Sequence, residues 1–167
     1  MPVLDPFTFE YLSHSEEQTQ RLGARLGALL PAHAVIALIG TLGAGKTQFA
    51  RGIGTGWGAQ QPLRSPSFTL VQEHHRDRDN RTLYHIDLFR IEHNDGMQTF
   101  GLQEILEDGQ SVSIIEWADR APQMIPDDAI VVKFELHSES KRHMTFSTRS
   151  AATWQILLAF RKSAFGV

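Results

Sequence analysis

A glycine-rich motif, set between an apolar run and a helical pattern, constrains the fold of this chain more than any other feature. The motif is Gly-Thr-Leu-Gly-Ala-Gly-Lys-Thr at residues 40–47, and it matches the phosphate-binding pattern G-x-x-x-x-G-K-[ST] at every fixed position. Residues 35–39 before it are apolar and largely β-branched, which is typical of a strand buried on both faces of a parallel sheet. Residues 47–53 after it indicate a short helix that ends in Gly52, Gly54 and Gly56. The sequence therefore predicts a strand, a phosphate-binding loop and a helix, in that order.

The loop suits phosphate because closely spaced backbone N–H groups can surround the negative charges of a nucleotide. Glycines at positions 40, 43 and 45 lack a Cβ, so the chain can adopt positive φ values and approach the phosphate oxygens. The N-terminus of the following helix adds to the attraction. Lys46 is placed to reach the β- and γ-phosphates, and the Thr47 hydroxyl to bind Mg²⁺. We therefore expect the loop to bind a nucleotide through its β- and γ-phosphates, together with Mg²⁺.

Composition limits the classes of function. A chain of 167 residues with 41% apolar content predicts a single domain over residues 1–167. The net charge of −3 argues against independent capture of a nucleic acid, and the absence of cysteine excludes disulfides. The sequence shows neither a signal peptide nor a run of about 20 apolar residues that would span a membrane. We expect a cytoplasmic protein that does not contact membranes and is a monomer on its own.

The remaining patterns predict a mixed fold. A Ser-x-x-Glu capping box at residues 13–16 precedes a helix that stops at Pro31. A second helix is expected over residues 97–106, and a third over residues 151–162. The other strands are expected at residues 7–12, 82–89, 111–117, 129–136 and 144–148. Residues 64–71 are expected to form a polar turn that leads into a further strand, and this strand is expected to form a hairpin with residues 82–89. The fold class predicted is α/β: a three-layer P-loop NTPase fold with parallel strands at its centre and antiparallel strands at its margins.

Hydrolysis requires an acid that holds the metal and a group that places the nucleophile. Glu116 ends an apolar strand, where a metal-holding acid would lie beside the loop; the alternative is a surface carboxylate. Asp87 also follows an apolar run, and its alternatives are an ion pair with Arg90 or a turn cap. Ser65 and Ser67 lie on a proline-constrained loop that could respond to the γ-phosphate, although local sequence alone favours ordinary turn residues. The histidines at positions 74, 75 and 85 lack the spacing of a zinc site.

Four motifs together resemble the bacterial TsaE family, also called YjeE. They are Gly-Ala-Gly-Lys-Thr at residues 43–47, Ser-Pro-Ser-Phe-Thr-Leu-Val at 65–71, Tyr-His-Ile-Asp-Leu-Phe-Arg at 84–90 and Ile-Glu-Trp at 115–117. The resemblance implies a small P-loop ATPase that works with the TsaB and TsaD proteins to install threonylcarbamoyl on tRNA adenosine, with tRNA contacted only through these partners. It implies that the loop binds phosphate and Mg²⁺, that residues 65–67 act as a switch, and that Asp87 and Glu116 serve the metal and hydrolysis. It also places Trp117 beside the nucleotide.

The motifs and the resemblance give a defined set of expected site residues. Lys46, Asp87 and Glu116 are the expected catalytic residues, and Thr47 and Glu116 the expected metal ligands. The expected nucleotide contacts are Leu42, Gly43, Ala44, Gly45, Lys46, Thr47, Gln48, Ser67 and Trp117. The chain departs from the family at two positions, since the family usually has Asp where Thr41 stands and Thr where Gln48 stands.

Other functions share parts of this pattern. A small-molecule kinase shares the loop pattern, but no arginine-bearing lid segment is evident in the sequence. A regulatory GTPase would carry an N-K-x-D motif, which the chain lacks. A non-catalytic module that binds partners in a nucleotide-dependent way remains open, and it is favoured if changes at Asp87 and Glu116 leave function intact.

Overall fold

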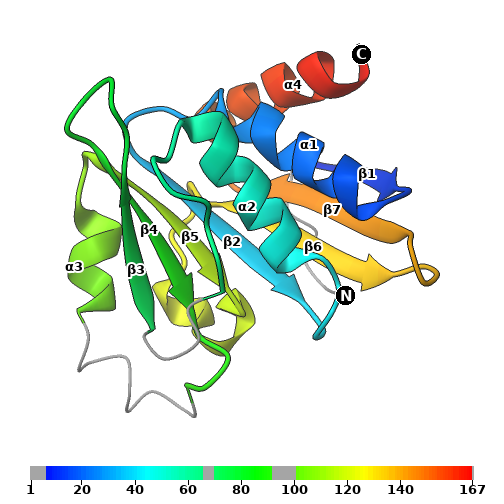
Figure 1. Cartoon of the computed structure of the whole chain (residues 1–167), viewed down its shortest axis with the longest axis horizontal. Helices are drawn as coiled ribbons and strands as arrows, with labels where there is room; N and C mark the ends of the chain where they lie inside the picture. Colours follow the sequence, from blue (N-terminus) through cyan, green and yellow to red (C-terminus); the bar gives the residue numbers. More distant parts are fainter. Residues whose placement is uncertain (1–6, 66–69, 92–100, 167) are drawn as a thin grey trace.

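One mixed sheet forms the centre of the molecule (Figure 1). The structure is a computed structural model, and it describes residues 7–65, 70–91 and 101–166. The strands described are β1 (Phe7–Ser13), β2 (Ala34–Gly40), β3 (Val71–His75), β4 (Thr82–Asp87), β5 (Ser111–Glu116), β6 (Ile130–Leu136) and β7 (Arg142–Thr148). They are arranged in the order β1-β7-β6-β2-β5-β4-β3. Strand β2 runs parallel to β5 and β6, β4 runs parallel to β5, and the outer pairs are antiparallel. The predicted fold class is confirmed.

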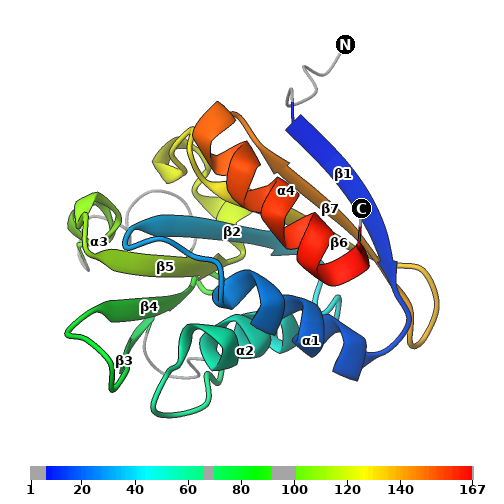
Figure 2. The same cartoon turned by 90° about the horizontal axis from the view of Figure 1, so that it is seen from above.

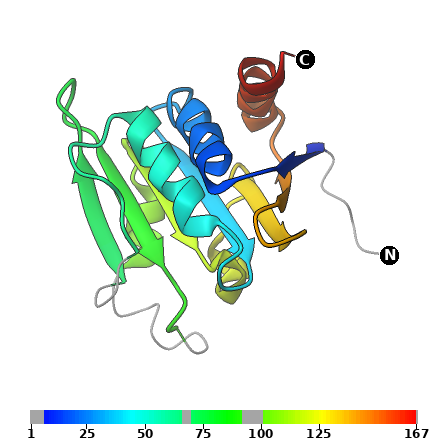
Figure 3. The same cartoon turned by 45° about the vertical axis from the view of Figure 1, so that its right-hand side comes forward.

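Helices cover both faces of this sheet, which gives three layers (Figures 2 and 3). Helices α1 (Glu16–Gly27), α2 (Lys46–Trp57) and α4 (Ala151–Phe165) pack on one face. The short helix α3 (Leu102–Glu107) and the residues after β5 pack on the other. Strand β2 is buried between them, because Ile36 and Leu38 belong to one apolar core and Val35 and Ala37 to the other. None of the helices in the described part of the chain is long and apolar enough to cross a membrane.

Helix α2 differs from the prediction, which ended it at Ile53. It continues through its glycines to Trp57 and ends where Gly58 adopts a φ of 100°. The glycines are retained inside the helix because α1 crosses it closely: a Cβ at Gly52 would lie 2.1 Å from the carbonyl oxygen of Gln20. At Gly56 a Cβ would lie 1.9 Å from the carbonyl oxygen of Ala24. These residues therefore serve helix packing, and termination at Ile53 was wrong.

The start of α1 is capped, but two residues later than predicted. The Ser15 hydroxyl accepts a hydrogen bond from the Gln18 backbone N–H at 3.1 Å, and the Gln18 side chain accepts one from the His14 N–H at 2.7 Å. Ser13, expected to be the cap, is buried and its hydroxyl lies 2.7 Å from that of Thr19. The helix ends at Gly27, well before Pro31.

Most other elements agree with the sequence within a few residues, but β3 begins only at Val71, the last residue of the segment 64–71 that was expected to lead into a strand. The hairpin of β3 and β4 and the antiparallel pair of β6 and β7 are confirmed. Helix α3 begins at Leu102, and the earlier part of the predicted helix, residues 97–100, lies outside the described residues. In the register of the parallel strands Leu38 pairs with Glu116, and Glu116 with Asp87. The topology therefore brings the glycine loop and both acids to one edge of the sheet.

Candidate nucleotide-binding site

The glycine loop joins the carboxyl end of β2 to the start of α2. Gly43 and Gly45 adopt φ values of 78° and 109°, which a residue with a Cβ would rarely take. Gly45 is also the N-cap of α2, and no side chain caps the helix start. The first N–H groups of α2 therefore point into the loop without an intrahelical partner, which is the arrangement that binds anions.

Lys46 lies beneath the loop and is bound to the loop's own carbonyl oxygens. Its Nζ donates to the carbonyl oxygen of Gly40 at 2.5 Å and to that of Thr41 at 2.7 Å. The ammonium also lies 4.2 Å from the centroid of the Trp117 ring, a cation–π contact. Burial lowers the pKa of Lys46, while the negative charges of Glu116, Asp119 and Asp87 act in the opposite direction. An ammonium held this way is a donor for which phosphate oxygens are alternative acceptors.

Glu116 links the helix to the sheet. Its Oε1 accepts a hydrogen bond from the Thr47 hydroxyl at 2.8 Å, and its Oε2 lies 2.5 Å from Nε2 of His85. The carboxyl group is almost fully buried, so the alternative of a surface carboxylate is wrong. The contact with His85 was missed by sequence reasoning, which considered this histidine only as a zinc ligand.

Asp87 stands opposite Glu116 on the neighbouring strand. Its Oδ1 accepts from the Phe89 backbone N–H at 2.9 Å, and its Oδ2 from the Ser65 hydroxyl at 3.4 Å. It thus caps the turn after β4, one of the alternatives considered, while also facing the loop. Burial raises the pKa of Asp87, and the charge of Glu116 raises it further, against the opposing effect of the hydrogen bond from Phe89.

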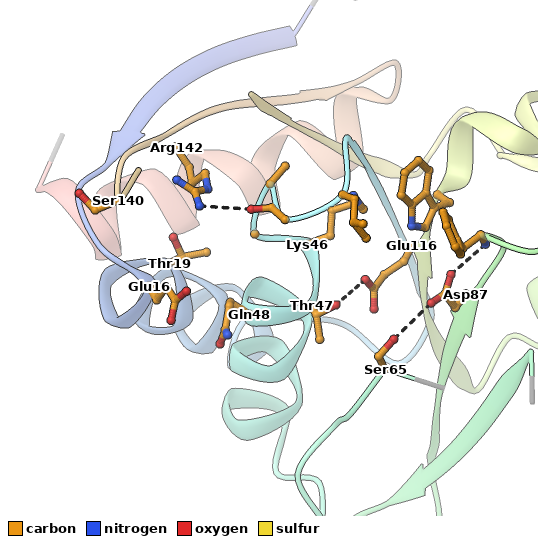
Figure 4. Close-up of a pocket in the computed structure, with 16 residues that line it drawn as sticks. Glu16, Thr19, Lys46, Thr47, Gln48, Ser65, Asp87, Glu116, Ser140 and Arg142 are labelled. Atoms are coloured by element: carbon orange, nitrogen blue, oxygen red, sulfur yellow. Dashed lines mark hydrogen bonds between the residues drawn. The ribbon is translucent and has the colours of Figure 1, made fainter. Parts of the chain in front are cut away.

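A pocket of about 270 Å³ collects these groups, and Figure 4 shows how their side chains converge on it. Its walls bring together the loop, the two acids and residues from the first helix and the β6–β7 turn. The lining residues are Glu16, Thr19, Leu42, Gly43, Ala44, Gly45, Lys46, Thr47, Gln48, Ser65, Asp87, Phe89, Glu116, Trp117, Ser140 and Arg142. All the expected nucleotide contacts are among them except Ser67, which lies outside the described residues.

Arg142 was not expected from the sequence. Its Nη2 donates to the carbonyl oxygen of Gly43 at 3.2 Å, while its Nη1 donates to carbonyl oxygens of the β6–β7 turn, including that of Ser138 at 3.0 Å. This residue lies 99 positions from the loop and belongs to no motif, so only the tertiary structure could reveal it. Glu16, Thr19 and Ser140 were missed because they reach the pocket from α1 and from the β6–β7 turn, and no motif of the sequence links these segments to the loop.

Aromatic groups close the other side of the pocket. Trp117 adopts a φ of 59°, the only positive value among the described residues other than glycine. Its ring lies 5.0 Å from that of Phe89 and 5.3 Å from the guanidinium carbon of Arg120. A backbone conformation that costs about 1–3 kcal/mol is retained where the surroundings fix it, often at a functional site. Here it turns the indole toward Lys46.

Strand, glycine loop and helix at the carboxyl edge of parallel strands define the class of this molecule as a P-loop α/β protein. The crystal structure of YdiB from Bacillus subtilis has this fold, with a TM-score of 0.75 at 24% identity over 93% of this chain and 95% of that one. Residues 13–144 match the model of the TsaE family, described as threonylcarbamoyl adenosine biosynthesis protein TsaE. The chain belongs to the TsaE family.

Curated relatives agree with this assignment. The tRNA threonylcarbamoyladenosine biosynthesis protein TsaE of Treponema pallidum is 34% identical over 134 residues, which are 80% of this chain and 96% of that protein. The protein of the same name from Aquifex aeolicus is 36% identical over 80% of this chain and 91% of its own length. The family membership supports a role in tRNA threonylcarbamoyladenosine biosynthesis.

Proposed function

We propose that this protein binds and slowly hydrolyses ATP in support of tRNA N6-threonylcarbamoyladenosine formation, together with TsaB and TsaD. One observation carries the proposal: Lys46, Thr47 and Glu116 converge in a single pocket at the start of a helix. A P-loop needs these three roles, namely a cation for the phosphates, a hydroxyl for the metal and an acid at the end of a strand.

The pocket offers two regions for the two parts of ATP. The N–H groups of the loop and the ammonium of Lys46 would receive the phosphates. Beyond the loop, Thr19 and Arg142 line the pocket together with Glu16, and we assign this side to the nucleoside. The hydrogen bond from Arg142 to the carbonyl oxygen of Gly43 would fix the conformation of the loop between these two regions.

The residues present also fit Mg²⁺. This ion prefers oxygen ligands, keeps several waters and is held by one or two protein groups together with substrate phosphates. The Thr47 hydroxyl and the Glu116 carboxylate, 2.8 Å apart, would hold it, directly or through water. When bound, Mg²⁺ neutralises charge that develops on the phosphates.

Asp87 is the group we assign to water. Hydrolysis breaks the bond between the γ-phosphorus and the β–γ bridging oxygen as water adds to the γ-phosphorus, giving ADP and inorganic phosphate. Because burial raises the pKa of Asp87, its carboxylate accepts a proton more readily than an exposed aspartate would. Lys46 meanwhile stabilises the charge on the phosphate oxygens. A slow rate is expected for the chain alone because Arg142, the one arginine among the described residues that line the pocket, is held by backbone carbonyl oxygens of the loop and of the β6–β7 turn.

Calorimetric titration with ATP tests the binding part of this proposal. Lys46→Ala should keep the fold and lose affinity, since a charge-assisted contact is worth about 1.5–3 kcal/mol, roughly 10- to 150-fold in Kd. Lys133→Ala is the matched control, because Lys133 is exposed on β6 and does not line the pocket. Equal affinity and equal turnover for the wild type and Lys46→Ala would refute the assignment of the loop. Hydrolysis should stop in EDTA.

The partner part is tested separately. The affinity of the protein for the TsaB–TsaD pair should differ between ATP, ADP and no nucleotide, because a ligand and a partner that favour the same state are linked in both directions. The ATPase rate should change when both partners are added. With a net charge of −3, the protein alone should show little affinity for tRNA, so tRNA would be reached through the partners. Three equal affinities would leave a simple ATPase.

A further inference from the structure

We propose that His85 is a positioning residue, which holds the Glu116 carboxylate in the one orientation that serves both Thr47 and Mg²⁺. The inference deepens the proposed function and rests on it. His85 itself lies behind the carboxylate, and it does not line the pocket. Its role would therefore be exerted through Glu116, without contact with the nucleotide.

The contact is short and shielded from water. Nε2 of His85 lies 2.5 Å from Oε2 of Glu116, and the two side chains are 0% and 3% exposed. A carboxylate accepts hydrogen bonds, so the hydrogen of this contact resides on Nε2 of the imidazole. With Oε2 held by His85 and Oε1 by Thr47, both carboxylate oxygens are fixed.

The register of the strands explains why Glu116 needs such support. Asp87 stands directly opposite Glu116 on β4, and like charges at opposite positions repel each other. His85 pairs with Ile114, two residues before Glu116, so its ring reaches the carboxylate diagonally across the same face of the sheet. A donor at this position draws Oε2 away from Asp87 and leaves Oε1 directed at the helix start.

The burial of His85 argues against a role in packing alone. Its Nδ1 is buried without a hydrogen-bond partner within the described part of the chain. A buried polar atom without a partner destabilises the folded protein, and an apolar side chain would fill the same space without that cost. The N–H donated to Glu116 is thus the feature that an apolar residue could not supply. Groups that orient metal-holding side chains commonly change metal affinity by 10- to 100-fold when removed.

Two substitutions at position 85, of nearly equal shape, separate the effect of the N–H donor from the effect of side-chain volume. His85→Gln keeps an N–H donor near the position of Nε2, whereas His85→Met has a similar length and no donor. His74→Met is the control, because His74 lies on the same face of the adjacent strand β3, also has a buried unpartnered nitrogen, and has no hydrogen bond to Glu116. Circular dichroism and thermal melts establish that each variant is folded.

The readout is the Mg²⁺ dependence of ATP binding, measured by calorimetry in EDTA and over a range of Mg²⁺ concentrations. We expect His85→Met to bind ATP as the wild type does in EDTA and to need 10- to 100-fold more Mg²⁺ for the same gain in affinity. His85→Gln and His74→Met should stay within about threefold of the wild type. A Mg²⁺ midpoint of His85→Met equal to that of the wild type would overturn the inference, and so would equal losses in the Met and Gln variants at position 85.

A measurement on the protein without nucleotide or metal keeps this test independent of the proposed function. Long-range proton–nitrogen NMR of the wild type should show His85 with its hydrogen on Nε2, and Glu116→Gln should shift that resonance. An imidazole with its hydrogen on Nδ1 and none on Nε2 would refute the contact even if ATP binds. Conversely, the expected tautomer in a protein with no Mg²⁺-dependent ATP binding would confirm the contact and reject the proposed function.

Discussion

The close crossing of α1 and α2 predicts a large effect from a single methyl group. A Cβ at Gly56 would lie 1.9 Å from the carbonyl oxygen of Ala24 and 2.7 Å from its carbonyl carbon. Ordinary contact begins at 3.4 Å, so Gly56→Ala must separate the helices locally by about 1.5 Å. Overpacking of this kind costs about 1–3 kcal/mol, and a contact with backbone places it near the upper end.

Helix propensity acts in the opposite direction and sets the net value. Alanine inside a helix is about 1 kcal/mol more favourable than glycine. We therefore expect Gly56→Ala to lower the free energy of unfolding by about 2 kcal/mol, which corresponds to roughly 4–8 °C in Tm for a chain of this size. Gly52→Ala should behave alike, since its Cβ would lie 2.1 Å from the Gln20 carbonyl oxygen.

Urea and thermal unfolding, followed by circular dichroism, measure this effect. Gly109→Ala is the control, because a Cβ there meets nothing within 4 Å and its stability should change by less than about 0.5 kcal/mol. Gly56→Ala should also weaken ATP binding, since α1 carries Thr19 into the pocket. A Gly56→Ala variant as stable as the wild type, or more stable, would refute the reasoning and show that these helices can separate freely.

Three further predictions concern the pocket. Asp87→Asn should raise Tm at neutral pH while lowering turnover. Because burial raises the pKa of Asp87, its ionisation destabilises the folded protein. This destabilisation is fully present above the folded-state pKa and absent below the ordinary aspartate pKa of about 3.9. The gain in Tm should therefore shrink as melts are repeated at falling pH, and a gain independent of pH would contradict this. Arg142→Met should weaken ATP binding about fivefold, the effect of about 1 kcal/mol for loss of its hydrogen bond to Gly43, and calorimetry measures this change. ATP should change the fluorescence of Trp117, because Lys46 lies 4.2 Å from its ring, and this change should be lost in Lys46→Met.

The parts of the fold that follow from local pattern could be predicted from the sequence. The apolar run of residues 35–39 predicted strand β2, because burial on both faces requires continuous apolar residues. The glycine motif that follows it predicted the loop. Glu116 was found because it ends a second strand of this kind. The extent of α2 was not predicted, because glycine has a low helix propensity. Only the close approach of the α1 backbone explains the glycines at positions 52 and 56 inside this helix.

In the candidate site, too, residues within a local motif could be predicted and residues that depend on tertiary contacts could not. Lys46 and Thr47 belong to a contiguous motif, so their placement needed no knowledge of the tertiary structure. His85 contacts Glu116 on the neighbouring strand and Arg142 contacts Gly43 in the loop, and their sequence neighbours carry no signal of those contacts. For His85 the one available signal was its position two residues before Asp87, which places both side chains on the same face of a strand.

Lys46 and Arg142 share a property that bears on how the pocket would respond to phosphate. Each cation is held by backbone carbonyl oxygens: Lys46 by those of Gly40 and Thr41, and Arg142 by that of Gly43 and others in its own turn. Carbonyl oxygens carry only a partial charge, so an anionic phosphate oxygen would be the stronger acceptor for Lys46, whereas Arg142, on the side assigned to the nucleoside, would keep its bond to Gly43. Binding would then exchange one set of hydrogen bonds for a better one without leaving a buried donor unpaired at any stage. Because the acceptors that Lys46 would give up are the carbonyl oxygens of Gly40 and Thr41, phosphate binding would act on the conformation of the loop.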